Sequence, residues 1–448
     1  MKPAVRTDSM TNEHGNERLK LGSLLIRGGR VIDASRDLDQ VGDVLVRDGR
    51  IVEIGAGLNH ADEVLDATGC IVCAGFIDTH VGVRDPGYEE DETTATATAA
   101  ALAGGFTRIA ALPDTLPVVD NASAAEYVVL QAKRAANCRV HPLGAVTRGH
   151  AGQELADLGQ LARSGALAFT DSQSAIGSAE IMRRALEYAR MFNRPIFVHP
   201  QDPTLTAGGV MHEGYYSTLL GLRGMPAAAE EILVSRDIAL AELTGGRIHL
   251  MSISTRGAVE QVRRAKQRGI AVTCDVTPHH LALTDADMQD YDSNFKVRPP
   301  LRSADHVSAL IEGLVDGTID AISSDHQPWA SEKKDRELDQ VPFGIVGLET
   351  LLPLCVKTLI EPAKLTWPQL VSRLTTGPAR ILGLNDAGTL AIGAAADVTV
   401  IDPNATWTID PSRFRSKSRN TPFAGWNVRG QVRAVAYNGE IRYRAGSV

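Results

Sequence analysis

The stretch GFIDTHVGVRDPG, residues 75–87, decides how the rest of the chain is interpreted. It begins as an apolar run typical of a short β-strand and continues into three side chains that can bind metals or anions: Asp78, His80 and Arg84. Functional side chains are expected at the carboxyl ends of strands in a parallel barrel, because active sites lie at that face. The stretch therefore predicts a strand of a parallel sheet with a site at its end.

The middle of the chain, from about residue 75 to 383, alternates apolar strands with helical stretches. Two examples of the helical stretches are SAEIMRRALEYARMF, residues 178–192, and GAVEQVRRAKQRG, residues 257–269. Alternation of this kind over some 300 residues argues for a parallel α/β sheet, and its length suits a (β/α)₈ barrel.

The two ends of the chain differ from the middle in their predicted secondary structure. Residues 22–74 and 384–448 contain short β-rich runs broken by Gly, Asp and Asn-Gly turn signals. The first 21 residues are polar and lack the apolar core of a signal peptide, so we expect a disordered N-terminal tail. The sequence thus predicts a tail, a central barrel over 75–383 and a β-rich module assembled from both ends.

Composition excludes several classes of function. The 448 residues carry a net charge of −8 without a basic block, which argues against a nucleic-acid partner. No apolar run approaches the 18 residues that a membrane span needs. The five cysteines are odd in number and scattered, which favours a reducing cytoplasm, and Cys70 and Cys73 are expected to be buried strand thiols.

Several apolar runs of the central region end in potential ligands. They are GFIDTH, ALAFTD, RPIFVHP, RIHLMSIS, AVTCDVTPHH and TIDAISSDH, and their ends supply His80, Asp171, His199, His279, His280, Asp325 and His326. A single His or Asp after a strand is usually a turn or capping residue. Several such residues on one face of one barrel match the imidazole and carboxylate set that zinc uses in hydrolases.

These motifs resemble one family closely. GFIDTHVGVRDPGYEEDET resembles the first-strand motif of the bacterial-type dihydroorotases, and the likeness continues through CDVTPHHLALTD, RPPLRS, SSDHQP, PFGIVGLET and SKSRNTPFAGW. The resemblance covers nearly the whole chain from about residue 22. It implies a distorted (β/α)₈ barrel of the TIM type, with the N- and C-terminal segments joined in a small β-sandwich.

The resemblance also implies a zinc site, from which this sequence departs. His80, Asp171, His199 and Asp325 occupy ligand positions of the family, and Asp325 is also the general base there. Gly82 stands where the family has the second His of a His-x-His pair. Ser252 replaces a further His, and His249 three residues earlier is not expected to substitute for it. At most one weakly held zinc ion is therefore expected.

Substrate contacts implied by the resemblance are altered as well. Arg84 is kept where the family grips the substrate carboxylate. Asp114 stands in place of a neutral Asn, and Trp329 in place of a substrate-binding His. A carboxylate facing an anionic substrate opposes binding in a low-dielectric pocket.

Three readings follow from these departures. The first is a non-catalytic dihydroorotase-like chain of pyrimidine biosynthesis, kept as a homodimer that supports assembly of aspartate transcarbamoylase, a partner that the resemblance suggests. The second is an active dihydroorotase with a reduced, single-metal site. The third is a cyclic-amide hydrolase of other specificity. The charged run at 331–339 is expected to be a solvated loop, or a lid as the resemblance allows.

Overall fold

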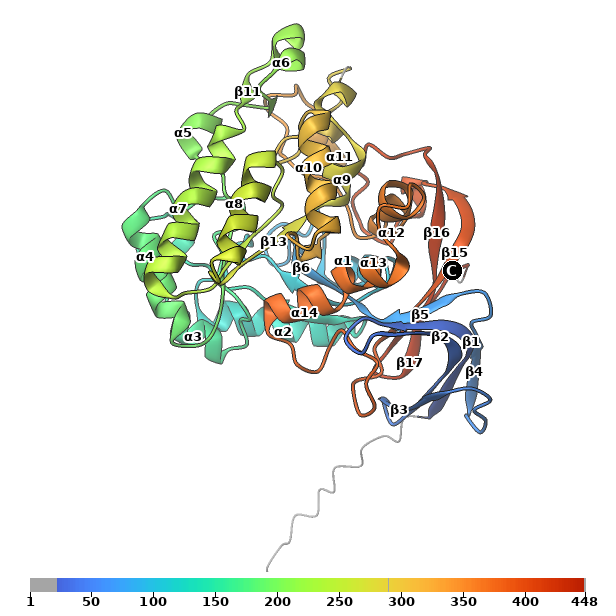
Figure 1. Cartoon of the computed structure of the whole chain (residues 1–448). Coiled ribbons are helices and arrows are strands. Elements are labelled where there is room, and N and C mark those ends of the chain that lie inside the picture. Colours follow the sequence, from blue (N-terminus) through green and yellow to red (C-terminus); the bar gives the residue numbers. More distant parts are fainter. Residues whose placement is uncertain (1–21, 289, 447–448) are drawn as a thin grey trace, which may run out of the picture.

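The computed structural model describes residues 22–288 and 290–446, so the predicted tail over residues 1–21 lies outside the described part. Two arcs of parallel strands form the centre of the molecule (Figure 1). One arc runs in the order β6-β7-β8 and the other in the order β14-β13-β12-β9. The strands are β6 (Phe76–Val81), β7 (Phe106–Ala111), β8 (Arg139–Pro142), β9 (Ile196–Val198), β12 (Ile248–Leu250), β13 (Val272–Val276) and β14 (Ala321–Ile322).

Single bridges close the two arcs into a barrel. Phe169 pairs with Gly144 beyond β8 and with Ile196 at the start of β9, and so takes the place of a short strand. On the other side His326 pairs with Val81 of β6. These irregular joints account for the distortion of the barrel, and the predicted barrel fold is confirmed.

Helices cover the outside of the barrel. The longer ones are α1 (Thr94–Ala103), α2 (Ala122–Ala135), α3 (Leu158–Arg163), α4 (Ala179–Arg190), α7 (Ala228–Thr244), α8 (Arg256–Gln267), α10 (Ala304–Val315), α13 (Trp367–Leu374) and α14 (Thr376–Leu382). The sequence dictates them locally: α4 buries Met182, Ala185, Leu186 and Ala189, which share one helical face. The Ser178 hydroxyl caps its first turn by accepting a bond from the Ile181 N–H.

Short elements lie in the loops beyond the strand ends. They are α5 (Pro203–Thr206), α6 (Tyr215–Leu220), α9 (Pro278–Ala282), α11 (Ser331–Lys334), α12 (Leu351–Cys355), β10 (Met211–His212), β11 (Gly224–Met225), the 3₁₀ turns η1 (Arg148–His150), η2 (Asp285–Asp287), η3 (Ser293–Phe295) and η5 (Pro411–Arg413), and the π-helical turn η4 (Val356–Ile360). In Figure 1, α6 projects at the top of the molecule.

Strands from both ends of the chain join in one sheet. It has eight strands in the order β17-β16-β15-β5-β1-β2-β3, with β4 beside β1. Its members are β1 (Ser23–Asp33), β2 (Leu38–Arg47), β3 (Arg50–Gly55), β4 (Glu63–Asp66), β5 (Ile71–Ala74), β15 (Val398–Thr408), β16 (Asn427–Tyr437) and β17 (Glu440–Arg444). The link between the ends is the antiparallel pairing of β5 with β15, visible where blue and red strands meet in Figure 1.

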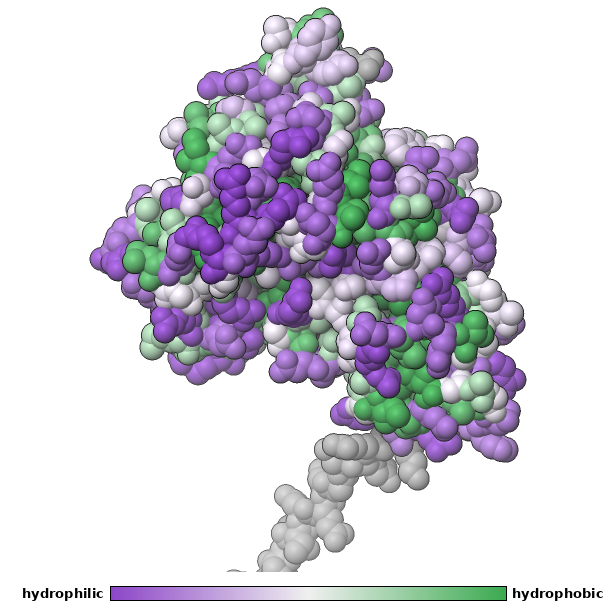
Figure 2. Space-filling view, viewed as in Figure 1, coloured by the Kyte–Doolittle hydropathy of each residue, from purple (hydrophilic) through white to green (hydrophobic). Residues whose placement is uncertain are grey.

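Apolar side chains from both β5 and β15 form the core of this terminal sheet. Val72 of β5 and Val398 and Val400 of β15 belong to one buried cluster. Cys70 and Cys73 are free and buried beside it, as expected. On the face shown in Figure 2, apolar side chains also break the polar surface over this sheet, and its exposed residues include Val41 and Val64. Among the described residues no helix is long and apolar enough to cross a membrane.

Candidate active site

Three buried side chains meet at the carboxyl ends of the barrel strands. His80 lies near the end of β6, Asp275 lies in β13, and Asp325 follows β14. The His80 Nε2 atom lies 3.0 Å from Oδ2 of Asp275, and its Nδ1 atom lies 3.5 Å from Oδ1 of Asp325. Both ring nitrogens of His80 therefore face a carboxylate, an arrangement that suits a protonated imidazolium.

The charges in this cluster favour a protonated His80 and an ionised Asp275. Burial alone would lower the pKa of His80, but Asp275 and Asp325 outweigh it and raise that pKa well above its usual value. Burial alone would likewise raise the pKa of Asp275, and His80 and His249 outweigh it and lower it. The cluster thus holds charged groups that stabilise one another inside the barrel.

Asp275 is a residue that the sequence interpretation missed. Its carboxylate accepts bonds from His249 Nε2 at 2.8 Å, from the Ser252 N–H at 2.7 Å and from the Thr79 hydroxyl at 2.9 Å. It lies in the run AVTCDVTPHH, of which only the two histidines at the end were predicted as potential ligands. The signal was available, because an acidic residue inside an otherwise apolar strand needs a buried partner.

His249 is joined to the cluster by its hydrogen bond to Asp275. The sequence did not predict that it would replace the missing ligand. Its Nδ1 atom contacts the Thr273 hydroxyl at 2.9 Å, while Nε2 faces Asp275. Both nitrogens therefore have protein partners. The hydroxyl of Ser252, by contrast, is buried without a partner among the described residues.

Asp171, one of the predicted metal ligands, accepts hydrogen bonds from the loop after β8. Its Oδ1 atom accepts the N–H groups of Val146 and Thr147, both at 2.9 Å, and its Oδ2 atom accepts the Thr147 hydroxyl at 2.5 Å. The carboxylate thus fixes the loop that follows β8. Its assignment as a ligand stays a prediction.

His199 and the pair His279-His280 line the same end of the barrel. His199 donates from Nε2 to the Arg298 carbonyl at 3.2 Å, and its Nδ1 atom is buried without a partner among the described residues. His280 donates from Nε2 to the Pro299 carbonyl at 2.9 Å. Burial lowers the pKa of His199 and lowers that of His280 to about 4, so both rings are neutral near pH 7.

Gly82 lies against the His326 carbonyl and the side chains of Gln327 and Arg84. A Cβ atom at this position would lie 3.1 Å from the His326 carbonyl oxygen, 3.2 Å from Gln327 Oε1 and 3.4 Å from Arg84 Cζ. A histidine here would therefore require its neighbours to shift.

The residues present do not fit the two-zinc site that the resemblance implies. Among the described residues, no group of three or more His, Cys, Asp or Glu side chains is arranged to hold a metal ion. His80 donates to Asp275 and forms an ion pair with Asp325, and Asp171 accepts backbone N–H groups. Among the histidines at the strand ends, His199 Nδ1, His279 Nε2 and His326 Nε2 are buried without a hydrogen-bond partner in that part of the chain.

Arg84, the predicted carboxylate-binding residue, is already paired. Its guanidinium donates to Asp114 Oδ2 at 2.9 Å and to Gln327 Oε1 at 2.6 Å, and its Cζ atom lies 4.3 Å from the centre of the Trp329 ring. Both substituted positions, Asp114 and Trp329, therefore contact the arginine directly. The chain itself supplies the anion that this guanidinium binds.

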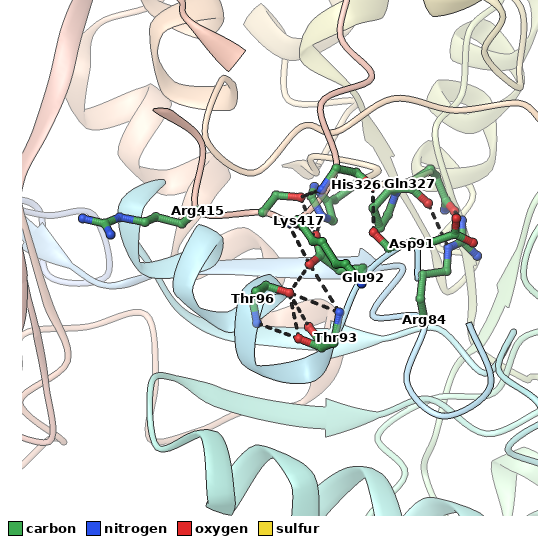
Figure 3. Close-up of polar contacts among 12 residues, drawn as sticks. Arg84, Asp91, Glu92, Thr93, Thr96, His326, Gln327, Arg415 and Lys417 are labelled. Carbon is green, nitrogen blue, oxygen red and sulfur yellow. Dashed lines mark hydrogen bonds and ion pairs between the residues drawn. The ribbon is translucent and has the colours of Figure 1, made fainter. Parts of the chain in front are cut away.

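A network of acidic side chains ties the first barrel loop to the C-terminal segment (Figure 3). Glu92 accepts hydroxyl groups of Thr96 and Ser416, and the Lys417 N–H at 3.0 Å. Asp91 binds the Lys333 ammonium at 2.6 Å. This network fixes the segment that leads from β6 into α1.

The segment 331–344 is held by two buried lysines, and Lys334 contradicts the expectation of a wholly solvated loop. Lys334 Nζ donates to the carbonyls of Pro342 and Gly344, at 3.1 and 3.3 Å. Lys296 Nζ donates to the carbonyl of Leu338 at 2.6 Å. Burial lowers the pKa of Lys334 to about 7 and that of Lys296 to about 8.

Comparison with known proteins places this site in context. The family model described as Dihydro-orotase-like matches residues 69–258, and that of the Amidohydrolase family matches residues 340–443. A dihydroorotase of Anaeromyxobacter dehalogenans is 51% identical over 377 residues, covering 84% of this chain and 87% of the relative. One of Solibacter usitatus is 47% identical over 94% of this chain and 98% of its own length.

Solved structures agree in fold. The L-hydantoinase (dihydropyrimidinase) of Arthrobacter aurescens superposes with a TM-score of 0.86 at 24% identity, over 96% of this chain and 97% of that one. A D-hydantoinase gives 0.80 at 20% identity, over 94% and 95%. At such identities the likeness concerns the architecture: a barrel with a β-sandwich built from the terminal strands.

Proposed function

Because this chain belongs to the dihydroorotase family, we propose that it acts in pyrimidine biosynthesis as a non-catalytic member that supports assembly of aspartate transcarbamoylase. The proposal has two parts that are tested separately. The first concerns the chemistry of the barrel, and the second concerns the partner.

The observation that carries the first part is the pairing of Arg84 with Asp114. An incoming carboxylate must displace Asp114 at 2.9 Å and Gln327 at 2.6 Å before it reaches the guanidinium. It would then lie beside the displaced Asp114 carboxylate, and like charges in a partly buried pocket repel strongly. The arginine therefore favours its internal partner over an anionic substrate.

The donor set supports the same conclusion. Zinc is the cofactor that the family implies, and it needs neutral imidazole nitrogens and carboxylate oxygens with free lone pairs. His80 offers neither nitrogen while its imidazolium donates to Asp275 and pairs with Asp325. Gly82 and Ser252 lack imidazoles altogether. We therefore derive no catalytic step through zinc in this chain.

The second part rests on the contrast between the site and its surroundings. The segment 416–426, which matches the family motif, is tightly bonded: Ser416 contacts Glu92, and Asn420 donates to the carbonyls of Gln327 and Gly344 at 3.0 and 3.1 Å. A fold retained around an altered site is expected of a protein kept for assembly. A homodimer is part of this proposal.

A second candidate is an active dihydroorotase with a single-metal site, and the comparisons favour it over the first. Relatives named dihydroorotase share about half of their residues with this chain. His80, His199 and Asp325 are retained, and His199 Nδ1 is free of protein partners in the described part of the chain. A cyclic-amide hydrolase of other specificity is the third reading.

Metal content and turnover separate these candidates. The purified chain, never exposed to chelator, is analysed for zinc and assayed for dihydroorotate hydrolysis and for cyclisation of carbamoyl aspartate. The proposal expects less than about half an equivalent of zinc per chain, because a protein zinc site needs about four ligands. It also expects no turnover above background. Turnover that chelation abolishes would establish the second candidate instead, and chelatable turnover of other cyclic amides alone would establish the third.

The partner is tested by co-purification from the native host followed by light scattering. The proposal expects a complex that contains both this chain and the transcarbamoylase. A transcarbamoylase that is fully assembled and active without this chain, together with a monomeric chain, would contradict the assembly role.

A further inference from the structure

A small pocket lies between the barrel and the terminal sheet, away from the barrel mouth. It is lined by the end of α1, by α12 and the segment before it, and by β15, η5, β16 and β17, and its volume is about 120 Å³. In Figure 1, α12 lies beside β15 and β16 at this junction. The aromatic and charged members of the lining are Glu349, Trp407, Asp410, Arg413, Phe414 and Tyr443. No residue of the candidate active site is among the described residues that line it, so the pocket is a separate place for a ligand.

Glu349 provides this pocket with a carboxylate that lacks a cationic partner in the described chain. Its Oε1 atom accepts the N–H groups of Arg415 and Ser416, at 2.9 and 3.1 Å, and its Oε2 atom accepts that of Arg415 at 3.0 Å. Among residues 22–288 and 290–446 no lysine, arginine or histidine side chain forms an ion pair with it. Burial outweighs these hydrogen bonds and raises the pKa of Glu349 to about 7. A cation at Oε2 would therefore stabilise the ionised form.

The other charged lining residues offset each other. Hydrogen bonds from Ser412 and the charge of Arg413 lower the pKa of Asp410, which places Arg413 and Asp410 close together. The helices α1 and α12 add no charge, because they and the residue after α1 contribute only Ala103, Gly104, Leu352 and Pro353. The pocket is therefore net negative once Glu349 is ionised.

Aromatic rings form the wall beside this carboxylate. The Trp407 Nε1 atom donates to the Gly430 carbonyl at 3.1 Å, which fixes the indole ring. Burial and the charge of Glu349 raise the pKa of Tyr443, so its phenol ring lies near that carboxylate. Aromatic faces attract cations, and a planar guanidinium stacks on them better than a compact ammonium. A carboxylate beside aromatic rings thus suits a planar organic cation.

The pocket is preorganised and admits one small group. Gly104, at the end of α1, lies so close to the Leu348 carbonyl that a Cβ atom would not fit, and this contact fixes the residue before Glu349. A protein cavity of about 150 Å³ holds one benzene ring. The 120 Å³ of this pocket therefore admits a guanidinium head group, while the rest of a longer molecule would stay outside.

We propose that this pocket binds the guanidinium group of an arginine-like molecule, stacked on the aromatic wall and donating to Oε2 of Glu349. The inference goes beyond the proposed function and does not rest on it, because neither the predicted zinc ligands nor Arg84 line the pocket. The guanidinium can belong to a free metabolite or to an arginine side chain of a partner chain, and both sources share the same chemistry.

Calorimetric titration of the full chain at pH 8 and constant ionic strength tests the assignment. We expect methylguanidinium to bind with a Kd of about 1–5 mM, and methylammonium, which is not planar, to bind at least about fivefold more weakly. Agmatine represents a free metabolite, and N-acetyl-L-arginine methylamide represents an arginine within a peptide. The tighter binder of these two identifies the source of the guanidinium.

The pH supplies a second readout. About one tenth of a group with a pKa of about 7 is ionised at pH 6, so the Kd of methylguanidinium should be about tenfold higher there than at pH 8. The charged and titratable neighbours of Glu349 keep their charge state over this range, and they are Glu92, Asp410, Arg413, Arg415, Arg419 and Tyr443.

Two variants locate the site. Glu349→Gln removes the charge, so it should weaken methylguanidinium binding at pH 8 at least about tenfold and abolish the pH dependence. Ala103→Leu fills the pocket from the end of α1 and should block the probe to a similar extent. It leaves the hydrogen bonds of Glu349 in place, which keeps the test decisive where Glu349→Gln does not fold. The matched control is Glu312→Gln, at an exposed glutamate of α10, and it should bind normally.

Three outcomes would overturn the proposal. They are absence of heat with 20 mM methylguanidinium at pH 8, about four times the weaker expected Kd; methylammonium binding as tightly as methylguanidinium; and unchanged affinity in both Glu349→Gln and Ala103→Leu.

Discussion

Replacing Asp275 by Asn should destabilise the barrel more than any surface change of the same kind. The carboxylate of Asp275 faces two histidines, His80 at 3.0 Å and His249 at 2.8 Å, and also accepts the Ser252 N–H and the Thr79 hydroxyl. The change is nearly isosteric, so it leaves no cavity. It removes one negative charge and turns one acceptor into a donor.

The magnitude follows from the burial of the group. Asp275 and His249 are completely buried, and the His80 side chain is 2% exposed. Removing one partner of a buried ion pair leaves the other charge without compensation, which costs about 3–5 kcal/mol. His80 keeps only Asp325, at 3.5 Å. The new amide nitrogen faces the His249 and His80 nitrogens in one orientation and the Ser252 N–H in the other, and it accepts a hydrogen bond from none of them.

Urea unfolding at pH 7, followed by circular dichroism, measures the effect. The matched control is Asp316→Asn, whose partly exposed carboxylate pairs with Arg263 at 2.8 Å, and such a surface pair contributes about 0–1 kcal/mol. We expect the loss in Asp275→Asn to be the same with and without chelator. A loss no larger than that of Asp316→Asn would refute the argument that this cluster stabilises the barrel through charge pairing.

Other predictions concern the segment 331–344, the missing ligands and the altered contacts. Between a folded pKa of about 7 and the unfolded value of 10.5, the unfolded chain binds more protons at Lys334, so stability should rise with pH. Lys334→Met should remove about 1.4 kcal/mol per pH unit from this slope between pH 8 and 10, measured by urea midpoints. The exposed Lys364→Met serves as the control, and equal slopes would contradict the burial argument. Gly82→His alone should lower the melting temperature, because its Cβ atom would lie 3.1 Å from the His326 carbonyl. Gly82→His with Ser252→His should raise zinc content in elemental analysis, and a metal-free double variant would refute the view that these two positions limit binding. Dihydroorotate turnover should need Asp114→Asn and Trp329→His in addition, since metal alone does not position the substrate; turnover in the double variant would show that these contacts are not limiting.

The amino-acid sequence by itself determined the architecture and the list of groups at the strand ends. Strand and helix periods are local, so alternating apolar runs and amphipathic helices such as α4 can be read from neighbouring residues. The same locality explains why His80, His199 and Asp325 could be predicted at one end of the barrel, because parallel strands finish at a common face. Gly82 and Ser252 stood out because they interrupt a known motif.

Only the tertiary structure decided which of these groups are partners. His80 and Asp275 are 195 residues apart in sequence, and Arg84 and Gln327 are 243 apart, yet each pair is in hydrogen-bond contact. Lys334 lies in a charged run typical of a solvated loop, but it is buried because the chain that follows it folds back and presents the carbonyls of Pro342 and Gly344. Hydrogen-bond partners across a barrel depend on strand register and loop closure, and neither is encoded in the period of a single segment.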